Sequence, residues 1–384
     1  MRLVRNLSIK ATLTVPVTVL ALMLITAMSW ETIMVYLPND SRATTLDQAN
    51  QMSDLLLTAA ADEARERGFT VSYLYKLSTG QKDTGLLASI KEQRRAGDAA
   101  LDSALGLTEQ LARHGVDRAS LTRHKESVMD ARKRVDALRA KVDAASDTGA
   151  APARQQWFNA ATDLIFAAAQ LRLAAFSPKG DAEIAAYSNN MIKQALWLVS
   201  EYAGRERAAL APVIAAKQPL SAAQRAQLSG YRNLVDQQLS YLHDTIQTVF
   251  SGDRISGSHG EEFTRAWDAV QQVFLGRFQK LRTKVYAAAT SGNYPISGQQ
   301  WLNESTEAIN SLVRLSTVLS KDATLRVDRA KSLSSRTLSV AALLTAISVL
   351  AAVIPLGPIF HVPGRLRSLQ KPAPPIHHEN DRAL

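Results

Sequence analysis

The sequence contains no cysteine and few aromatic residues. Its 384 residues include only 6% Phe, Trp and Tyr. The absence of cysteine excludes disulfides, thiolate metal sites, iron–sulfur clusters and cysteine nucleophiles. Because aromatic and β-branched residues favour strands, their scarcity argues against a sandwich, a barrel or a Rossmann sheet. Alanine is abundant instead, with 59 residues, and it favours helices because its side chain loses no rotamer entropy there.

The chain also lacks a concentrated basic segment, although its net charge is +10. Residues 1–10 carry +3, residues 361–384 carry +2, Glu31 carries −1, and the remaining +6 is mixed with acids over residues 37–336. A nucleic-acid groove needs basic residues clustered on one face, so we predict no nucleic-acid partner. Positive charge at both ends instead favours the cytoplasmic side of a membrane.

Two long stretches, residues 11–30 and 337–360, contain no charged residue. At 1.5 Å per residue, either stretch can cross a hydrocarbon core of roughly 30 Å as a helix. We therefore predict transmembrane helices over residues 11–36 and 337–360, with a cytoplasmic N-terminus at 1–10 and a short cytoplasmic tail at 361–384. Residues 37–336 would lie outside the inner membrane. A cleaved signal peptide is the alternative for the first stretch, and a buried soluble helix is the alternative for the second.

Turn residues divide the segment between these stretches at regular intervals. Clusters of Gly, Pro, Asn and Asp predict turns at 37–42, 78–85, 114–117, 147–152, 177–181, 217–221, 251–260 and 291–298. The eight segments between them have helical periodicity. We predict an all-α fold of two tandem up-down four-helix bundles, 37–177 and 178–336, flanked by the two transmembrane helices. The last helix has no stop signal before residue 337.

Three short motifs recur in the same order at similar offsets. QQWFN at 155–159 returns as QQWLN at 299–303, LRAKV at 138–142 as LRTKV at 281–285, and RER at 65–67 as RER at 205–207. Repeats of this kind indicate two homologous modules. The repeated Trp157 and Trp301 are interpreted as core residues.

The repeated RER motif supplies the candidate site residues. Apolar residues around it recur every three or four positions, which places Arg207 on the apolar stripe and Arg67 at the matching position. Arg65 and Arg205 lie about 200° around the helix and are the second choice. A buried guanidinium is costly unless it is paired. The partner is either an internal acid or a small oxyanion that fits guanidinium forks from both modules. The internal acid would be Glu63 for Arg67, or an acid across the bundle for either arginine.

The sequence carries no arrangement typical of an enzyme. Its seven histidines form no HExxH motif or other paired ligand set. It also lacks a P-loop or a GxSxG motif in a supporting context. We predict no catalytic activity, no cofactor and no metal site.

Several of these motifs resemble a known family. ERGFTVSYL at 66–74 resembles the start of the NIT, or nitrate- and nitrite-sensing, domain. QRRAGD at 93–98 and AGRERA at 203–208 resemble two later elements of that domain. The resemblance spans roughly residues 50–320. It implies an extracytoplasmic, all-helical sensor of nitrate or nitrite, as found on receptor kinases, chemoreceptors and nucleotide cyclases. It also implies that Arg67 and Arg207 hold the anion.

Such receptors continue from the second membrane span into a HAMP linker and an output domain. This sequence ends 24 residues after residue 360, so we expect a truncated receptor, a homodimer by analogy, with a separate cytoplasmic signalling partner. Anion binding would let the two arginines approach and shift the modules, and the last helix would carry that shift across the membrane. The alternatives are a non-sensing helical membrane scaffold and the same fold tuned to a different small ligand.

Overall fold

The regular structure of the chain is helical. The computed structural model describes residues 9–32, 34, 37–145, 150–176, 181–250 and 258–353. Every regular element in these ranges is a helix, which confirms the all-α prediction. Residues 42–329 form one compact unit, and the described residues of 1–41 and 330–384 form another. The predicted tail 361–384, residues 354–360 of the second apolar stretch and most of the segment 1–10 lie outside the described residues.

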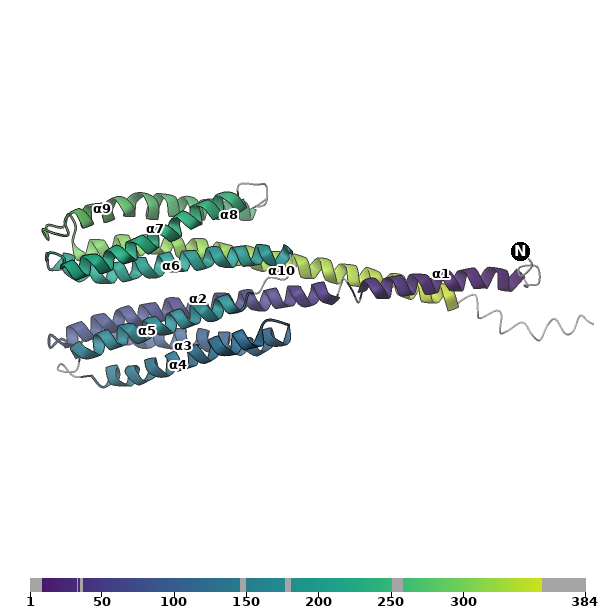
Figure 1. Cartoon of the computed structure of the whole chain (residues 1–384), viewed down its shortest axis with the longest axis horizontal. Helices are drawn as coiled ribbons and strands as arrows, with labels where there is room; N and C mark the ends of the chain where they lie inside the picture. Colours follow the sequence, from purple (N-terminus) through teal and green to yellow (C-terminus); the bar gives the residue numbers. More distant parts are fainter. Residues whose placement is uncertain are drawn as a thin grey trace, which may run out of the picture. The chain divides into compact units, whose positions relative to one another are not determined.

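The first four helices of the unit 42–329 lie alongside one another (Figure 1). They are α2 (Leu37–Leu77), α3 (Thr84–Arg113), α4 (Arg118–Asp143) and α5 (Ala150–Ala174). Asp83 and Asp117 cap the N-termini of α3 and α4 by accepting from backbone N–H groups. The helices share one hydrophobic cluster that contains the fully buried Trp157. This confirms the core interpretation of Trp157.

One predicted turn in this region is wrong. Residues 37–42 lie inside α2, which begins at Leu37. Pro38 is compatible with this position because the first N–H groups of a helix have no intrahelical acceptor, so the missing donor of proline costs nothing there. The turn predicted at 114–117 is confirmed, since α3 ends at Arg113 and α4 begins at Arg118.

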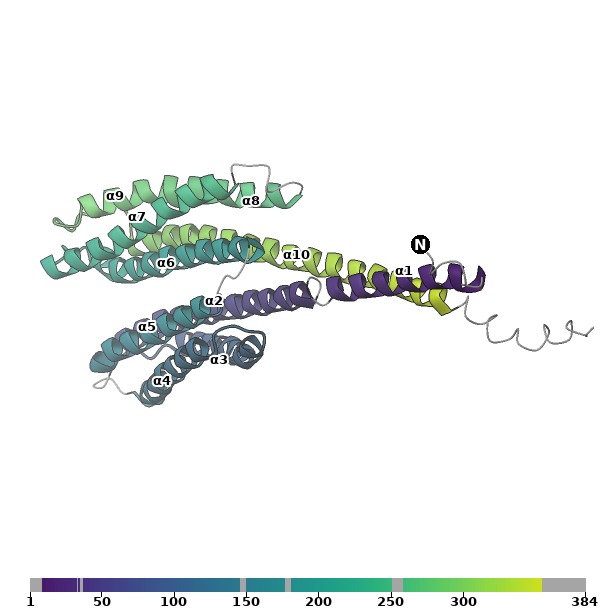
Figure 2. The same cartoon turned by 45° about the vertical axis from the view of Figure 1, so that its right-hand side comes forward.

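The remaining helices of this unit enclose a second hydrophobic cluster, which contains the fully buried Trp301. Their ribbons are drawn in Figure 2. They are α6 (Asp181–Ala215), α7 (Ala222–Phe250), α8 (Ser258–Ala269), the π-helix η2 (Val270–Phe278), α9 (Gln279–Ala287) and α10 (Gly298–Val353). The nine-residue π-helix was not predicted, because the residues 270–278 keep an ordinary helical pattern. The core interpretation of Trp301 is confirmed.

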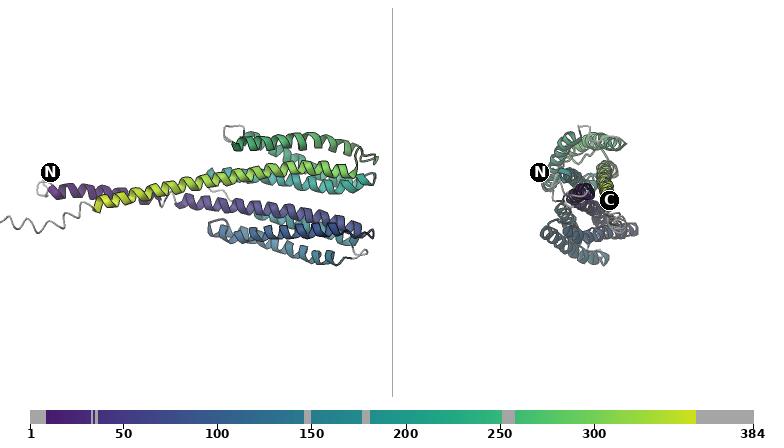
Figure 3. Two further views of the ribbon diagram at one scale, coloured as in Figure 1. Left: turned by 180° about the vertical axis from the view of Figure 1, so that it is seen from behind. Right: turned by 90° about the vertical axis from the view of Figure 1, so that its right-hand side faces the viewer.

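The other unit contains α1 (Ile9–Glu31) and the end of α10. Thr345 Oγ1 of α10 lies 3.7 Å from Met28 Sδ of α1. α10 is one helix of 56 residues (Figure 3), as expected from the missing stop signal. In the part of the chain that the structure describes, we find no helix with both the length and the apolar character needed to cross a membrane.

Candidate functional site

Arg67 lies on α2 and points into the unit 42–329, where it is 5% exposed. Its Nη1 and Nη2 atoms donate to the two carboxylate oxygens of Glu201 on α6, at 2.7 and 3.0 Å. Nη1 also donates to Thr162 Oγ1 at 2.9 Å. The guanidinium carbon lies 5.0 Å from the centre of the Phe158 ring. Arg67 therefore sits in a fork-to-fork ion pair with a hydroxyl and an aromatic face around it.

Glu201 also forms an ion pair with Arg205. Its Oε1 atom accepts from Arg205 Nε at 2.7 Å. Burial alone would raise the pKa of Glu201, but the charges of Arg67 and Arg205 and their hydrogen bonds lower it, so the carboxylate remains ionised. The salt-bridge interpretation is therefore right for Arg67, although the partner comes from α6 and is not Glu63 of its own helix.

Arg207 occupies the matching position in the second repeat but has different partners. It is half-buried, and its Nη1 atom donates to Thr306 Oγ1 at 2.8 Å. Within the described ranges, no carboxylate lies at ion-pair distance from Arg207. Burial, followed by the positive charge of Arg67, lowers the pKa of Arg207. Both arginines meet at α6, since Arg207 belongs to this helix and Arg67 pairs with its Glu201.

The repeat explains why the two arginines differ. At the offset of the RER motif, the residue that matches Glu201 in the first repeat is Ala61. The residue that matches Phe158 in the second repeat is Leu302. The first repeat thus lacks the acid that would neutralise Arg207. Arg67 and Arg205 share the carboxylate of Glu201, whereas Arg207 contacts no described carboxylate. The three guanidiniums therefore carry an excess of positive charge, which favours a small anion.

The two second-choice arginines have different environments. The side chain of Arg65 is 54% exposed and pairs with Asp62 of its own helix. The side chain of Arg205 is 10% exposed. Its guanidinium carbon lies 5.2 Å from the centre of the Phe166 ring and 4.9 Å from the centre of the Tyr202 ring. Arg205 therefore belongs to the group around Glu201, whereas Arg65 faces elsewhere.

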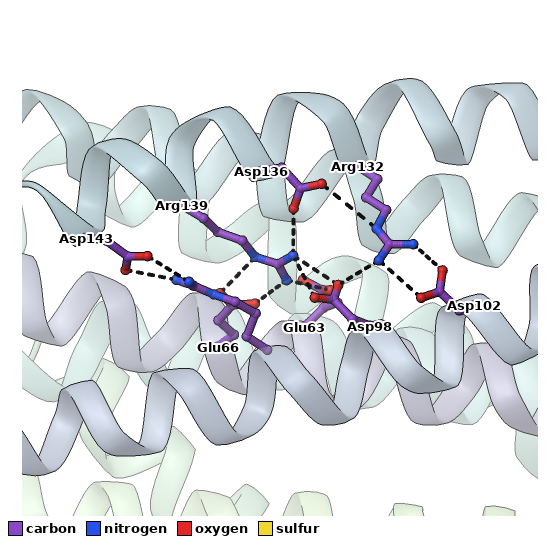
Figure 4. A network of polar contacts seen from close by, with 9 residues as sticks. Glu63, Glu66, Asp98, Asp102, Arg132, Asp136, Arg139 and Asp143 are labelled. Atoms are coloured by element: carbon purple, nitrogen blue, oxygen red, sulfur yellow. Dashed lines mark hydrogen bonds and ion pairs between the residues drawn. The ribbon is translucent and has the colours of Figure 1, made fainter.

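The glutamates of the RER motifs have a structural role. Glu66 is fully buried and accepts from Arg94 Nε at 2.9 Å and from Arg139 Nε at 3.1 Å (Figure 4). Glu206 accepts from Arg282 Nε at 2.8 Å in the second repeat. Each RER glutamate thus binds the arginine of the repeated LR-x-KV motif, and Arg94 of the QRRAGD element joins the first of these pairs.

Arg139 is the centre of the first network (Figure 4). It is 4% exposed and also contacts Glu63 and Asp98, at 3.1 and 3.0 Å. Burial alone would lower the pKa of Arg139, but the hydrogen bond and charge of Glu66 and the charge of Glu63 raise it. Burial raises the pKa of Glu63 to about 8, because the charge of Arg139 only partly offsets it.

This carboxyl makes the stability of the fold dependent on pH. Between pH 4.5 and about 8, folded Glu63 holds a proton that the unfolded chain has lost, so stability falls as the pH rises through that window. We expect a Glu63→Gln variant to lose stability less steeply than the parent chain, measured by urea unfolding at pH 5, 6, 7 and 8. Glu92→Gln, at an exposed position of α3, is the matched control. If the free energy of unfolding depended on pH equally in Glu63→Gln and in the parent chain, the raised pKa of Glu63 would be contradicted.

Three residues around the arginines were not predicted as site residues. Glu201 carries no signal in the sequence, because it lies outside the repeated motifs and its partner belongs to another helix. Thr162 and Thr306, however, each lie three residues after the end of the repeated motif QQWFN or QQWLN, at matching positions. Their repetition beside the two repeated arginines is the signal that could have identified them.

Comparison with known proteins agrees with the resemblance of the motifs. The family model described as "Nitrate and nitrite sensing" (NIT) matches residues 59–324. A solved structure titled "Structure of the NasR transcription antiterminator" has a similar fold, with a TM-score of 0.55. It is 18% identical, and the match covers 82% of this chain and 81% of that one. No curated protein sequence matches at a significant level.

Proposed function

Because the chain belongs to the NIT family of nitrate- and nitrite-sensing domains, we propose that it binds nitrate or nitrite between Arg67 and Arg207. One observation carries the assignment: Arg207 is half-buried beside Arg67 and has no carboxylate partner among the described residues. A buried positive charge without an acid is costly. A monovalent anion between the two guanidiniums would remove both that cost and their mutual repulsion.

The threonines suit the same ligand. Thr162 and Thr306 each accept a hydrogen bond from the neighbouring arginine. A hydroxyl that accepts in this way still has its own proton to donate. A planar oxyanion would therefore meet guanidinium N–H groups and two hydroxyl donors, related by the repeat. Glu201 would stay on Arg67 and Arg205 and hold them in place.

Anion binding would change the preferred positions of α2 and α6. Without the anion, repulsion between Arg67 and Arg207 opposes the attraction of the Arg67–Glu201 pair that joins these two helices. The bound anion would remove that repulsion and favour closer approach. Coupling of about 1–3 kcal/mol is typical of allosteric proteins and is enough to bias a two-state sensor. In this proposal residues 37–177 and 178–336 act as two modules, and α10 transmits the change in their positions. The protein would signal without catalysing a reaction.

The ligand is tested by thermal unfolding of the purified full chain. We expect nitrate and nitrite to raise the melting temperature progressively with their concentration, with about 2.7 kcal/mol of stabilisation at a hundred times the dissociation constant. Sulfate and chloride at equal ionic strength are the controls. An Arg67→Ala/Arg207→Ala variant should have a smaller response, because it lacks this site. An equal shift in that variant, or none in the parent chain, would refute the proposed site.

The scaffold alternative has one observation in its favour, the closed ion pair between Arg67 and Glu201. If both arginines were purely structural, no anion in the series would raise the melting temperature of the parent chain more than that of the Arg67→Ala/Arg207→Ala variant. If the same fold were tuned to a different ligand, a wider series of small anions would contain the one that does.

We further propose that residues 11–36 and 337–360 anchor the sensor in the inner membrane, with residues 37–336 outside it. In the unit that contains α1 and the end of α10, several large apolar side chains are exposed, among them Leu20, Leu22, Met23, Leu343, Ile347 and Leu350. Exposed apolar surface of this kind marks an interaction with a membrane or with protein. A second copy of the chain and a separate cytoplasmic protein are the partners that this arrangement suggests.

The anchor is tested by alkaline carbonate washing of membranes from cells that express the full chain. The protein should stay with the membrane pellet, whereas a chain of residues 37–336 should not. Release of the full chain by carbonate would show that the terminal stretches do not insert.

A further inference from the structure

A second group of buried cations shares no residue with the site around Arg67 and Arg207. Arg172 of α5 and Lys193 of α6 are each 1% exposed. Lys193 forms an ion pair with Asp54 of α2. No ion pair of Arg172 occurs in the ranges that the structure describes. The two cations and one carboxylate leave a net charge of +1 inside the fold.

Part of the hydrogen-bonding capacity of this group is unused. Arg172 Nη1 donates to Asn190 Oδ1 at 3.2 Å, and Ser53 Oγ donates to the same oxygen at 3.1 Å. Arg172 Nε, Arg172 Nη2 and Asn190 Nδ2 are buried, and the described part of the chain offers them no hydrogen-bond partner. Buried polar groups are nearly always satisfied in folded proteins, so three unsatisfied donors in one place require an explanation.

The two unused nitrogens of Arg172 define the shape of the missing acceptor. Nε and Nη2 lie on one edge of the planar guanidinium, and their N–H bonds point in the same direction. Such an edge matches two oxygens of a planar oxyanion, as in arginine–carboxylate pairs. Water could accept these hydrogen bonds, but it would leave the buried positive charge without compensation.

We propose that Arg172, Asn190 and Lys193 form a second anion site, which binds one monovalent planar oxyanion on the Nε–Nη2 edge of Arg172. One negative charge balances the net +1 of the group. Nitrate, nitrite and small carboxylates belong to this chemical class, whereas chloride lacks the two oxygens and sulfate has the wrong charge and shape. This inference does not depend on the site between Arg67 and Arg207.

Asp54 connects this site to α10. Its Oδ1 atom accepts from Ser320 Oγ at 2.8 Å as well as from Lys193. An anion beside Lys193 competes with Asp54 for the ammonium group and so changes the charge that Ser320 faces. Occupancy of the second site is thereby coupled to the long helix that ends the unit.

The test is a count of bound nitrate by isothermal titration calorimetry of the purified full chain, at pH 7 and constant ionic strength set by sodium sulfate. We expect Arg172→Met to bind one nitrate fewer per chain than the parent, and Arg207→Met to lose only the other nitrate. If the site between the two RER arginines does not exist, the parent binds one nitrate and Arg207→Met still binds one. Unchanged stoichiometry in Arg172→Met would overturn the proposal.

A second variant covers the possibility that Arg172→Met does not fold. Asn190→Asp keeps the side-chain volume and places a carboxylate against Arg172, so it should remove the same nitrate without lowering the melting temperature. Crystals of the parent chain grown in sodium nitrate should show planar density on the Nε–Nη2 edge of Arg172. Ordered water alone at that edge, or wild-type nitrate stoichiometry in Asn190→Asp, would overturn the proposal.

Discussion

An Arg67→Met variant is expected to have a free energy of unfolding about 3 kcal/mol below that of the parent chain, because it leaves a buried carboxylate with one partner fewer. Glu201 has a side-chain exposure of 3% and depends on Arg67 for two of its three hydrogen bonds. Arg205 remains on Glu201, so the loss should lie at the lower end of the range for a broken buried pair. Urea unfolding at pH 7 measures it.

The matched variant is Arg207→Met, at the equivalent position of the second repeat. This substitution leaves no buried carboxylate without a partner, since the guanidinium of Arg207 donates to Thr306 in the described structure. It also removes the repulsion between Arg207 and Arg67. Its free energy of unfolding should stay within about 1 kcal/mol of the parent value. Both variants should nevertheless lose the part of the nitrate response that comes from the site between the two arginines. Equal destabilisation by the two substitutions would contradict the asymmetry between the repeats.

Ala61→Glu tests the cause of that asymmetry directly. It gives the first repeat the acid that the second repeat has at Glu201. We expect the new carboxylate to pair with Arg207 and to reduce nitrate stabilisation to the level of Arg207→Met, although both arginines remain. Ala61→Gln, of nearly the same size but neutral, should keep the response. Nitrate stabilisation equal to that of the parent chain in Ala61→Glu would mean that Arg207 does not need an external anion.

The helices could be predicted from the sequence because their apolar residues are regularly spaced and Gly, Asp and Pro mark most of their ends. The same rule fails at Pro38, where a turn residue stands inside the first turn of α2. It also fails at residues 270–278, since the π-helix depends on backbone hydrogen bonding that the apolar pattern does not encode. The arginines could be found because they recur. Glu201 could not, because periodicity shows that a residue faces inward but not which helix meets it there.

Repetition also predicts which buried ion pairs stabilise the fold most. Arg139→Met and Arg282→Met remove the LR-x-KV arginines that hold Glu66 and Glu206. All four side chains are at most 5% exposed, so each substitution leaves a carboxylate buried without its main partner. We expect each variant to lose about 3–5 kcal/mol of unfolding free energy at pH 7.

Arg132→Met on α4 provides the control for an exposed network. Arg132 pairs with Asp102, whose side chain is 62% exposed, so its loss should cost less than about 1 kcal/mol. The pH dependence separates lost charge pairing from lost packing. Near pH 4 the carboxylates that lose their partner in Arg139→Met can take up protons. The difference in unfolding free energy between this variant and the parent chain should therefore shrink. A loss that is equally large at pH 4 and pH 7 would show that Arg139 stabilises the bundle mainly through the packing of its side chain.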